Sequence, residues 1–490
     1  MKFSNNRKFF LNIFTAALAV YGVTALPSFV VAAYFDEEVQ AAALGAVAIV
    51  CCAIGFGLRK MLDLKSTKVR MRMNYMTTIM TWLILIGITT VVFFFGRAEF
   101  TWIDSFFEAT ASLTTTGMGN LDVNIFPYSF QLWRSTLNWL GGVGIILISV
   151  SCLSEWEFSG HSLVSVEIPG PEFLKSSVTF KDTYRKIISV YVILTVVHFL
   201  LLVTCGMDIF PSVLTALSNI STAGMQHINN GVITHLSIPL KVVITLFAFL
   251  GSVNVSVFLL PRFRKFRLLG RRTEVSFYIS RLLITAFVIG LAISITTGEN
   301  LMNAVGKALM QTVAFFSTSG YIVTDCHAWP LICQVIILLQ MFIGSCAVST
   351  GGGLKMARAD IAVRTVAFGL FRHIHPHAVK PVRFNHEPLK QDQLVKANLF
   401  IALFMSIYVI GALFLSLDNK SESIYDALNY SQAMLTNTGT SIAELSAPGL
   451  AGQFSPLSKI VMSIEMLAGR LEIYPVIMLL SPAFWKADQS

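Results

Sequence analysis

Long apolar stretches with few charged residues follow one another along the whole chain. A helix needs roughly 20 mainly apolar residues to cross the hydrocarbon core of a bilayer. The stretches that meet this requirement are, approximately, 9–34, 39–58, 74–96, 131–152, 187–206, 237–260, 276–297, 331–366, 394–417 and 456–485. Hydrophobic residues make up 54% of the 490 residues and charged residues only 13%, which excludes a soluble globular protein. We therefore expect an all-α polytopic membrane protein.

The first apolar stretch has the basic flank of a signal peptide, because Lys2, Arg7 and Lys8 precede it. However, no small-residue cleavage site ends a short apolar core, and the apolar run continues to about Val31. The sequence therefore predicts a retained membrane helix with a cytoplasmic N-terminus. The seven cysteines have no metal-ligand spacing, which indicates thiols packed in the membrane.

Basic residues are concentrated in alternate loops, above all in those after the second and the sixth apolar stretch, and the intervening loops are mainly acidic. Short basic loops remain in the cytoplasm. Segments 59–73, 153–186, 261–275 and 367–393 are therefore expected to be cytoplasmic, together with the C-terminus. Membrane topology thus accounts for the net charge of +9, and nothing indicates nucleic-acid binding.

A unit of one apolar stretch, a short amphipathic segment and a small polar loop occurs four times. The loop cores are LTTTG (113–117), ISTAG (220–224), FSTSG (316–320) and LTNTG (435–439). Each segment before a loop is too short to cross a bilayer, and every repeat has the same orientation. The expected fold is four parallel membrane-helix/pore-helix/membrane-helix repeats around a pseudo-fourfold pore, after two extra transmembrane helices. The expected division is 1–70 for the extra helices and 71–155, 156–262, 263–390 and 391–490 for the repeats.

The loops have the residue types of a cation-binding ring. Glycine permits φ > 0, so the chain can turn its carbonyl oxygens toward a shared axis, and rings of carbonyl oxygens replace the hydration shell of an alkali cation. No carboxylate lies within the loops, which favours a monovalent ion over Ca²⁺ or Mg²⁺. The candidate ion-binding residues are Thr114, Thr115, Thr116, Gly117, Ser221, Thr222, Ala223, Gly224, Ser317, Thr318, Ser319, Gly320, Thr436, Asn437, Thr438 and Gly439. Asp122 and Glu444, just beyond two loops, either concentrate cations or are ordinary solvated carboxylates.

Within the eighth apolar stretch, the segment GSCAVSTGGGLK (344–355) separates two helical neighbours. Its glycines predict a helix break. The break is either a structural kink or a mobile loop that closes the pore below the selectivity filter, which is the name we give to the expected ring of four loops. Three consecutive glycines give more flexibility than a kink requires, which favours the mobile loop. The candidate gating residues here are Gly344, Ser349, Thr350, Gly351, Gly352, Gly353 and Lys355. Lys355 is either a pore charge or a snorkelling side chain.

Arg470 lies in the middle of the last apolar stretch, where a charge is costly unless it faces water or a partner. Glu465 and Glu472 are five and two residues away, a spacing that makes either a poor partner within one helix. The expectation is that Arg470 faces the pore below the loops and tunes flux together with segment 344–355. A structural pair with either glutamate is the alternative.

A histidine-rich cytoplasmic segment, FRHIHPHAVKPVRFNH (371–386), suggests a metal site at first sight. His373, His375, His377 and His386 have no cysteine or carboxylate cluster at ligand spacing, so a surface that contacts a partner is favoured. No nucleotide-binding loop or nucleophile–base pair occurs in the sequence, and enzyme activity is not expected.

These motifs resemble those of the Trk/Ktr family of bacterial potassium-uptake membrane subunits, most closely the Trk type with its two additional N-terminal helices. The resemblance covers nearly the whole chain and includes the four loops, GSCAVSTGGGLK, HPHAVKPV (375–382) and EMLAGRLEIYP (465–475). It implies a potassium-channel-like pore, a gating loop at 344–355, a pore-facing arginine at Arg470, and K⁺ as the bound and transported ion with no cofactor on this chain. It also implies a homodimer in the bacterial inner membrane and a cytosolic nucleotide-binding regulatory subunit. Cys346 and Val348 depart from the family's loop in detail.

A secondary carrier that couples K⁺ to H⁺ or Na⁺ is the main alternative, because broken helices and repeats also occur in alternating-access proteins. Those repeats are usually two and often inverted, whereas the four repeats here share one orientation. A purely structural or receptor-like membrane protein gives no reason for four such loops. The sequence therefore favours a pore.

Overall fold

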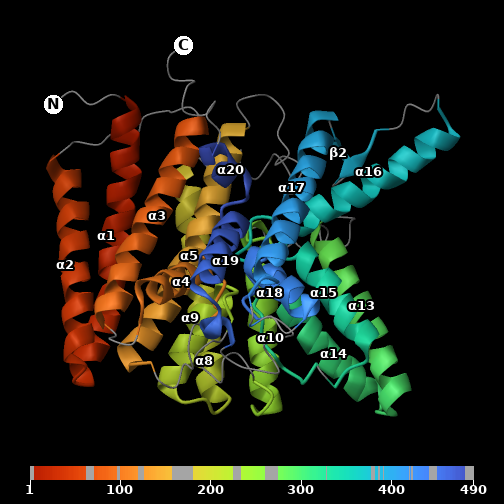
Figure 1. Ribbon diagram of the computed structural model, residues 1–490, viewed down its shortest axis with the longest axis horizontal. Coiled ribbons are helices and arrows are strands. Elements are labelled where there is room, and N and C mark those ends of the chain that lie inside the picture. Colours follow the sequence, from red (N-terminus) through yellow and green to blue (C-terminus); the bar gives the residue numbers. More distant parts are fainter. Residues whose placement is uncertain are drawn as a thin grey trace.

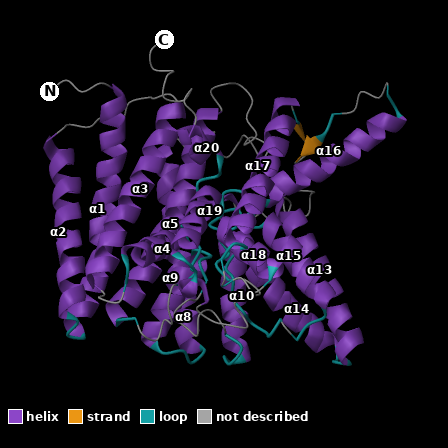
Figure 2. Cartoon of the chain, viewed as in Figure 1, coloured by secondary structure: helices purple, strands orange, loops and turns teal. Residues whose placement is uncertain are grey.

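The computed structural model is almost entirely helical (Figures 1 and 2). It describes residues 5–61, 71–96, 100–119, 126–156, 180–224, 233–259, 274–326, 328–376, 381–384, 387–389, 391–418, 420, 423–440 and 450–480. Within these ranges, the only strands are β1 (Arg383–Phe384) and β2 (Glu387–Pro388), which form a short antiparallel pair. The all-α fold expected from the sequence is confirmed.

The helices fall into three kinds. The long uninterrupted helices are α1 (Asn5–Tyr34), α2 (Glu38–Met61), α3 (Met71–Gly96), α5 (Tyr128–Trp156), α8 (Phe180–Thr204), α13 (Glu274–Thr297) and α17 (Gln391–Leu415). Short helices that lead into the Ser/Thr-Gly loops are α4 (Trp102–Leu113), α9 (Ile209–Ile220), α14 (Leu301–Phe316) and α18 (Ile424–Leu435). Interrupted pairs are α10 (Ile238–Ser252) with α11 (Ser256–Leu259), α15 (Leu331–Ile343) with α16 (Met356–Ile374), and α19 (Pro456–Arg470) with α20 (Tyr474–Leu480). A 3₁₀ turn, Leu450–Gln453, precedes α19.

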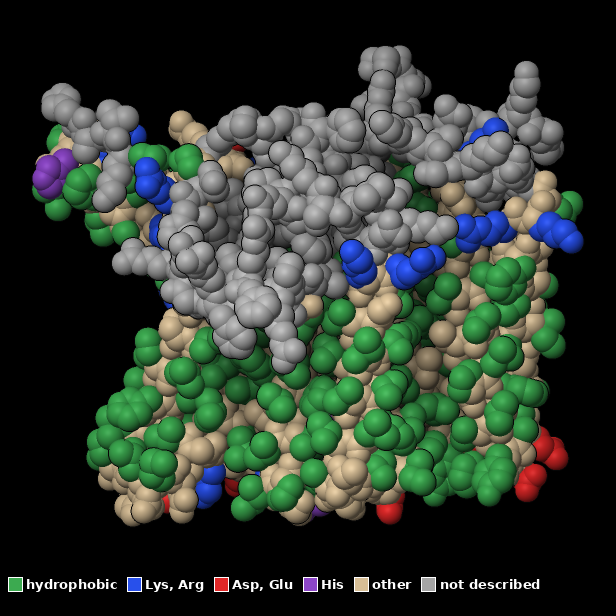
Figure 3. Space-filling view, turned by 180° about the vertical axis from the view of Figure 1, so that it is seen from behind, with side chains coloured by type: hydrophobic (Ala, Val, Ile, Leu, Met, Phe, Trp, Pro, Cys, Tyr) green, Lys and Arg blue, Asp and Glu red, His purple; other side chains and the backbone are tan. Residues whose placement is uncertain are grey.

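The outer surface is suited to a membrane. Six helices of the described chain are long and apolar enough to cross one: Arg7–Tyr34, Glu38–Met61, Tyr75–Gly96, Arg185–Thr204, Glu274–Thr297 and Gln391–Leu415. Figure 3 shows hydrophobic side chains over a broad band of the visible face, with Lys and Arg toward its upper border and Asp and Glu mainly at its lower end. This separation of charge along the long helices is the pattern that the alternating basic loops predict.

Three of the expected spans are broken rather than continuous. The break between α15 and α16 is the one that segment 344–355 predicts. The other two, at Val253–Val255 between α10 and α11 and at Leu471–Ile473 between α19 and α20, differ from the single spans expected at 237–260 and 456–485. Arg470 is consequently the last residue of α19, and it does not lie within a continuous helix.

Three of the four short helices, α4, α14 and α18, begin at a residue whose side chain caps the helix, whereas the side chain of Asp208 makes no cap hydrogen bond at the start of α9. Thr101 and Asp104 form a capping box at the start of α4, and Ser423 and Asp426 form the same box at the start of α18. The side chain of Asn300 accepts a hydrogen bond from the backbone of α14. At about 1.5 Å per residue, the 12 residues of α4, α9 or α18 extend only about 18 Å, which is less than the hydrocarbon thickness. These three helices are therefore too short to cross a membrane.

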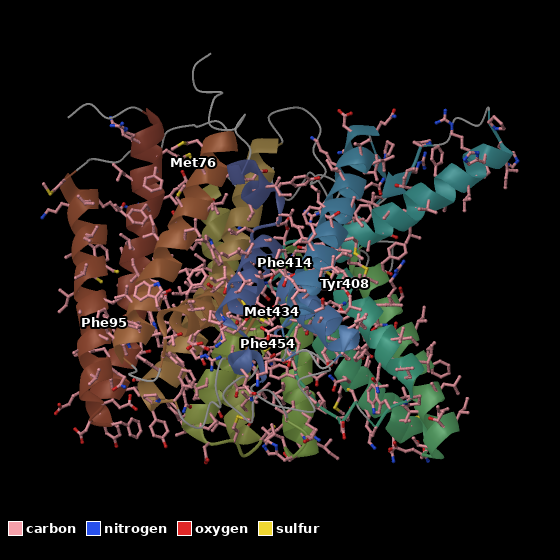
Figure 4. All side chains as sticks on the ribbon, in the orientation of Figure 1. Met76, Phe95, Tyr408, Phe414, Met434 and Phe454 are labelled. Carbon is pink, nitrogen blue, oxygen red and sulfur yellow. The ribbon has the colours of Figure 1, made fainter. Side chains whose placement is uncertain are left out.

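The two extra helices, α1 and α2, pack on each other and on the first repeat. The Tyr21 hydroxyl shares a 2.6 Å hydrogen bond with Thr89, and its ring meets Trp133 edge-on. The carboxylate of Glu37, between α1 and α2, accepts hydrogen bonds from the first residues of α5. Figure 4 shows Met434 and Phe454 near the centre of the fold, within a buried cluster to which α4, α18 and α19 contribute. Ala111 and Met434, near the loop ends of α4 and α18, are thus buried in the core.

Candidate functional site

The four Ser/Thr-Gly loops have one backbone conformation. The third residue of each five-residue loop core has a positive φ: Thr115 (55°), Thr222 (56°), Thr318 (58°) and Asn437 (53°). The glycine has a positive φ as well: Gly117 (74°), Gly224 (80°), Gly320 (68°) and Gly439 (76°). The sequence therefore repeats a specific chain path, and its glycines occupy the positions where the backbone requires them.

Threonine at positive φ is strained, because a β-branched side chain rarely adopts the left-handed region. The conformation is held by hydrogen bonds back to the short helices. In the first loop, the N–H groups of Thr116 and Gly117 both donate to the carbonyl of Ala111, at 3.1 Å each. The third and fourth loops repeat this at the carbonyls of Ala314 and Ala433. The loop N–H groups are thus used inside each repeat, while carbonyl oxygens meet the next loop.

The loops form a ring. A methyl group added at Gly224 would overlap the carbonyl oxygen of Ser319 in the third loop. In the same way, a methyl at Gly320 would overlap the carbonyl of Thr438, and one at Gly439 would overlap the carbonyl of Thr116. Each of these three glycines therefore lies against the next loop, and the fourth loop contacts the first.

The side chains of the ring are buried, uncharged and mostly bonded to one another. Hydroxyl pairs join Thr114 to Thr116 at 2.8 Å, Ser317 to Ser319 at 2.9 Å and Thr436 to Thr438 at 2.8 Å. The amide of Asn437 donates to Thr116 in the first loop and to the carbonyl of Met466 in α19, both at 2.9 Å. Because the hydroxyls support the loops, backbone carbonyl oxygens are the groups best suited to bind an ion.

A glycine in the second helix of three repeats lies against the end of the short helix. Gly141 packs on the carbonyl of Leu113, Gly251 on that of Ile220, and Gly469 on that of Leu435, with no room for a methyl group. This set was not predicted from the sequence, although each glycine follows the glycine of its loop by 24 to 30 residues. The glycines allow the second helices to approach the loops closely.

Segment 344–355, which we call the intramembrane loop, lies against the ring. All of its residues are buried. The Thr350 hydroxyl donates to the carbonyls of Gly251 at 2.9 Å and Ile220 at 3.1 Å, and the N–H of Gly352 donates to the Thr318 hydroxyl at 2.8 Å. A methyl group at Gly352 would overlap the carbonyl of Thr436 in the fourth loop. The loop thus contacts the second, third and fourth repeats.

Arg470 binds the middle of the intramembrane loop. Its side chain is 2% exposed and donates to the carbonyls of Thr350 at 2.6 Å and Gly141 at 2.8 Å. The alternative of a pair with a neighbouring glutamate is wrong, because Glu465 accepts from Ser431 and Glu472 pairs with Arg358. The guanidinium therefore joins the loop to the first repeat.

Lys355 closes the intramembrane loop on itself. Its ammonium donates to the carbonyl of Gly351 at 2.7 Å, and the residue is 7% exposed. The snorkelling alternative is wrong, because a snorkelling lysine places its charged end in water. Lys355 has φ +67° and is the last residue before α16, so its side chain and backbone both shape the end of the loop.

Several predicted residues lie elsewhere. Asp122, Glu444, His377 and His386 fall outside the described residues. His373 is exposed near the end of α16, and His375 stacks on Phe371 with ring centroids 4.7 Å apart, far in sequence from the four loops. Two ion pairs join Glu108 to Arg134 and Asp104 to Lys459. The sequence did not reveal them, because the partners are distant along the chain.

Long apolar helices around short helices that end in buried, uncharged loops define a polytopic membrane protein whose irregular backbone is buried in protein. Residues 43–487 match the protein-family model TrkH, described as "Cation transport protein". The chain belongs to this TrkH family, and the resemblance seen in the sequence is confirmed.

The relatives of this chain include transport proteins of the Trk system. The Trk system potassium uptake protein TrkH of Salmonella typhimurium is 27% identical over 424 residues, covering 86% of this chain and 87% of that protein. The Trk system potassium uptake protein TrkG of Escherichia coli is 25% identical over 481 residues, covering 96% of each. The crystal structure of the potassium transporter TrkH from Vibrio parahaemolyticus has a TM-score of 0.83 and 23% identity, covering 99% of this chain and 100% of that one. The fold is therefore the same.

Proposed function

We propose that this protein moves K⁺ across the membrane through a channel-like pore in which the four loops form the selectivity filter. The observation that carries the proposal is the ring, where glycines of three loops lie against carbonyl oxygens of the next. Neutral carbonyl oxygens suit an alkali cation. The names of the relatives, which are potassium uptake proteins, support K⁺ as the ion.

The intramembrane loop is the gate in this proposal. It is buried against three repeats, and Arg470 holds its middle through the carbonyl of Thr350. These contacts support a closed arrangement below the filter. Ion flow then requires the loop to move, which breaks the hydrogen bonds that Thr350 and Gly352 make. The acceptors of these bonds are uncharged oxygens, and water can replace either partner.

The orientation, location and assembly follow from the charge pattern and the family. We place both termini and the basic loops in the cytoplasm and the mouth of the filter outside, in the inner membrane of a bacterium.

We also propose a homodimer regulated by a cytosolic nucleotide-binding subunit, and the division of the chain into 1–70 and the four repeats. In the described part of the histidine-rich segment, His373 and His375 are exposed at the end of α16 and are therefore available to such a partner.

The test compares uptake of radioactive rubidium and sodium, side by side, in cells that lack their own potassium-uptake systems. We expect rubidium uptake to exceed sodium uptake when the full chain is expressed. The same protein in liposomes, recorded electrically, distinguishes the secondary-carrier alternative: single-channel currents support the pore, whereas flux at carrier turnover that requires a H⁺ or Na⁺ gradient supports the carrier. Absence of flux for every monovalent cation contradicts both.

A further inference from the structure

Glu274, the first residue of α13, reaches the intramembrane loop from a helix that has no part in the Arg470 contact. The residue is 3% exposed, and its Oε1 accepts a hydrogen bond from the N–H of Ala347 at 2.6 Å. Ala347 precedes Thr350 by three residues. A buried carboxylate thus holds the first half of the loop, just as a buried guanidinium holds its middle.

A second residue of α13 supports the same half of the loop. Tyr278 lies one helical turn after Glu274 and is fully buried. Its hydroxyl shares a 2.8 Å hydrogen bond with Ser252, whose carbonyl accepts from the N–H of Cys346 at 3.1 Å. The face of α13 that carries Glu274 and Tyr278 therefore supports the turn at Cys346–Val348, directly through Glu274 and through Ser252 in the case of Tyr278.

The charge of Glu274 is suited to this contact. A carboxylate makes stronger hydrogen bonds with backbone N–H groups than a neutral acceptor does. A negative charge at the first residue of a helix is also favoured by the partial positive charge of that end. The carboxylate of Glu274 is therefore favoured both by the start of its own helix and by the N–H of Ala347.

We infer that Glu274 is a positioning residue that holds the intramembrane loop in its closed arrangement and ties that loop to the cytoplasmic end of α13. This inference rests on the proposed gating role of the loop. Movement of the first turn of α13 must either break the hydrogen bond to Ala347 or carry the loop with it. In sequence, Glu274 lies at the end of the basic segment 261–275, which the charge pattern predicts to be cytoplasmic. The contact is thus a route from the cytoplasmic surface to the gate.

The experiment measures rubidium influx into liposomes that contain the purified full chain without any partner. Glu274→Ala is expected to raise the maximal rate about tenfold, the effect of losing a hydrogen bond to a charged acceptor, while the Michaelis constant for rubidium stays unchanged. Glu274→Gln keeps an acceptor for Ala347 and should restore most of the closed state. Glu299→Ala is the matched control, because Glu299 lies beyond the other end of α13 in an exposed pair with Lys307.

A double substitution separates gating from simple damage to the fold. If Glu274 and Arg470 hold one closed state, Glu274→Ala combined with Arg470→Gln should raise the rate by less than the product of the two single effects. Where Glu274→Ala fails to fold, Glu274→Asp carries the test, since its shorter side chain withdraws the acceptor, and its rate should exceed that of Glu274→Gln.

The outcomes distinguish this inference from the gate itself. If deletion of Ser349–Gly353 raises influx but folded Glu274→Ala, or Glu274→Asp in its place, matches the wild type, the role of Glu274 is refuted and the gate stands. If neither change raises influx, the gate and the role of Glu274 fail together. A changed Michaelis constant with an unchanged maximal rate also refutes the inference, because it assigns the effect to the filter.

Discussion

Single glycines determine how closely the loops of the ring approach one another. Gly224, Gly320 and Gly439 combine a positive φ with a neighbouring carbonyl that leaves no room for a methyl group. A side chain at such a position is strained by about 1–2 kcal/mol from its backbone alone. It must also displace an oxygen that we assign to ion binding.

We therefore expect Gly224→Ser, Gly320→Ser and Gly439→Ser to raise the Michaelis constant for K⁺ and to lower the preference for K⁺ over Na⁺. Paired rubidium and sodium uptake measures both quantities. Gly298→Ser is the control for backbone strain, because Gly298 has φ +72° but no neighbouring atom within 4 Å of an added methyl group. Wild-type selectivity in three well-expressed ring variants would exclude the filter.

Arg470 can act through its charge, which repels a cation, or through its planar guanidinium, which holds the intramembrane loop. Substitutions distinguish these two roles. The planar guanidinium reaches the carbonyls of Thr350 and Gly141 at once, a geometry that the single ammonium of lysine does not reproduce. Each hydrogen bond from a charged group contributes about 1.5–3 kcal/mol.

Arg470→Gln is accordingly expected to raise cation influx at least tenfold, because it removes both the charge and the fork that holds the loop. Arg470→Lys should give an intermediate rate if the fork matters, and a wild-type rate if only repulsion of the cation matters. Initial rates of rubidium influx distinguish these cases. An Arg470→Gln protein that folds and conducts like the wild type would show that neither role operates.

The sequence predicts some of these residues and not others, for a physical reason. The positive φ of Gly117 and its three counterparts follows from local chemistry, since glycine tolerates that conformation best. Thr115 also has a positive φ, a conformation that threonine does not prefer. It is tolerated because the next two N–H groups of the loop donate hydrogen bonds to the carbonyl of Ala111. The partners of Arg470 are likewise invisible to spacing rules, since they lie 120 and 329 residues away.

At the scale of elements, the intramembrane loop is a packed structure held by three helices. Its first half contacts α13 and the break after α10, its middle contacts the end of α19, and its last residues bond back onto the loop. Glycine-rich sequence alone is typical of mobility. In this structure the glycines allow close approach, because Gly351 and Gly352 lie against carbonyls of the third and fourth Ser/Thr-Gly loops.

Gly352→Ala should therefore displace the loop from the filter and raise rubidium influx several-fold, with the loop kept at full length. The matched control is Gly369→Ala in α16, where an added methyl group meets no neighbouring atom within 4 Å. Deletion of Ser349–Gly353 is expected to act in the same direction, and to weaken dependence on the cytosolic partner. Unchanged influx and regulation in the deletion would reduce the segment to a packing kink.

Helix breaks show where reasoning from the sequence reaches its limit. The break within 344–355 follows from its glycines, whereas the break after α10 depends on the N–H of Val255, which donates to the carbonyl of Val348 at 3.1 Å. After Arg470, both Glu472 and Ile473 have positive φ, which neither residue prefers. Contacts such as the pair between Glu472 and Arg358 hold that turn. Tertiary contacts thus override local propensity.

At the scale of the whole molecule, the ring of four loops must close between the two ends of the chain. The repeats are readable from the sequence because they recur in order, but the seam between the last and the first has no sequence signal. In the structure, α19 packs on α4, the amide of Asn437 donates to Thr116, and Lys459 pairs with Asp104. The backbones of the two loops also meet here, since a methyl group added at Gly439 would overlap the carbonyl oxygen of Thr116.

Lys459→Met should weaken this seam. The change leaves Asp104, whose side chain is only 16% exposed, without its cation, and losing a hydrogen bond to a charged group costs about 2 kcal/mol. We expect a lower melting temperature in detergent and a smaller preference for K⁺ over Na⁺, because the fourth and first loops are no longer held at one spacing. Lys459→Arg keeps the charge and should retain both properties. Because α19 also carries Arg470, a loosened seam should raise influx as well, whereas lower stability with wild-type selectivity and influx would show that the two end repeats meet only to stabilise the fold.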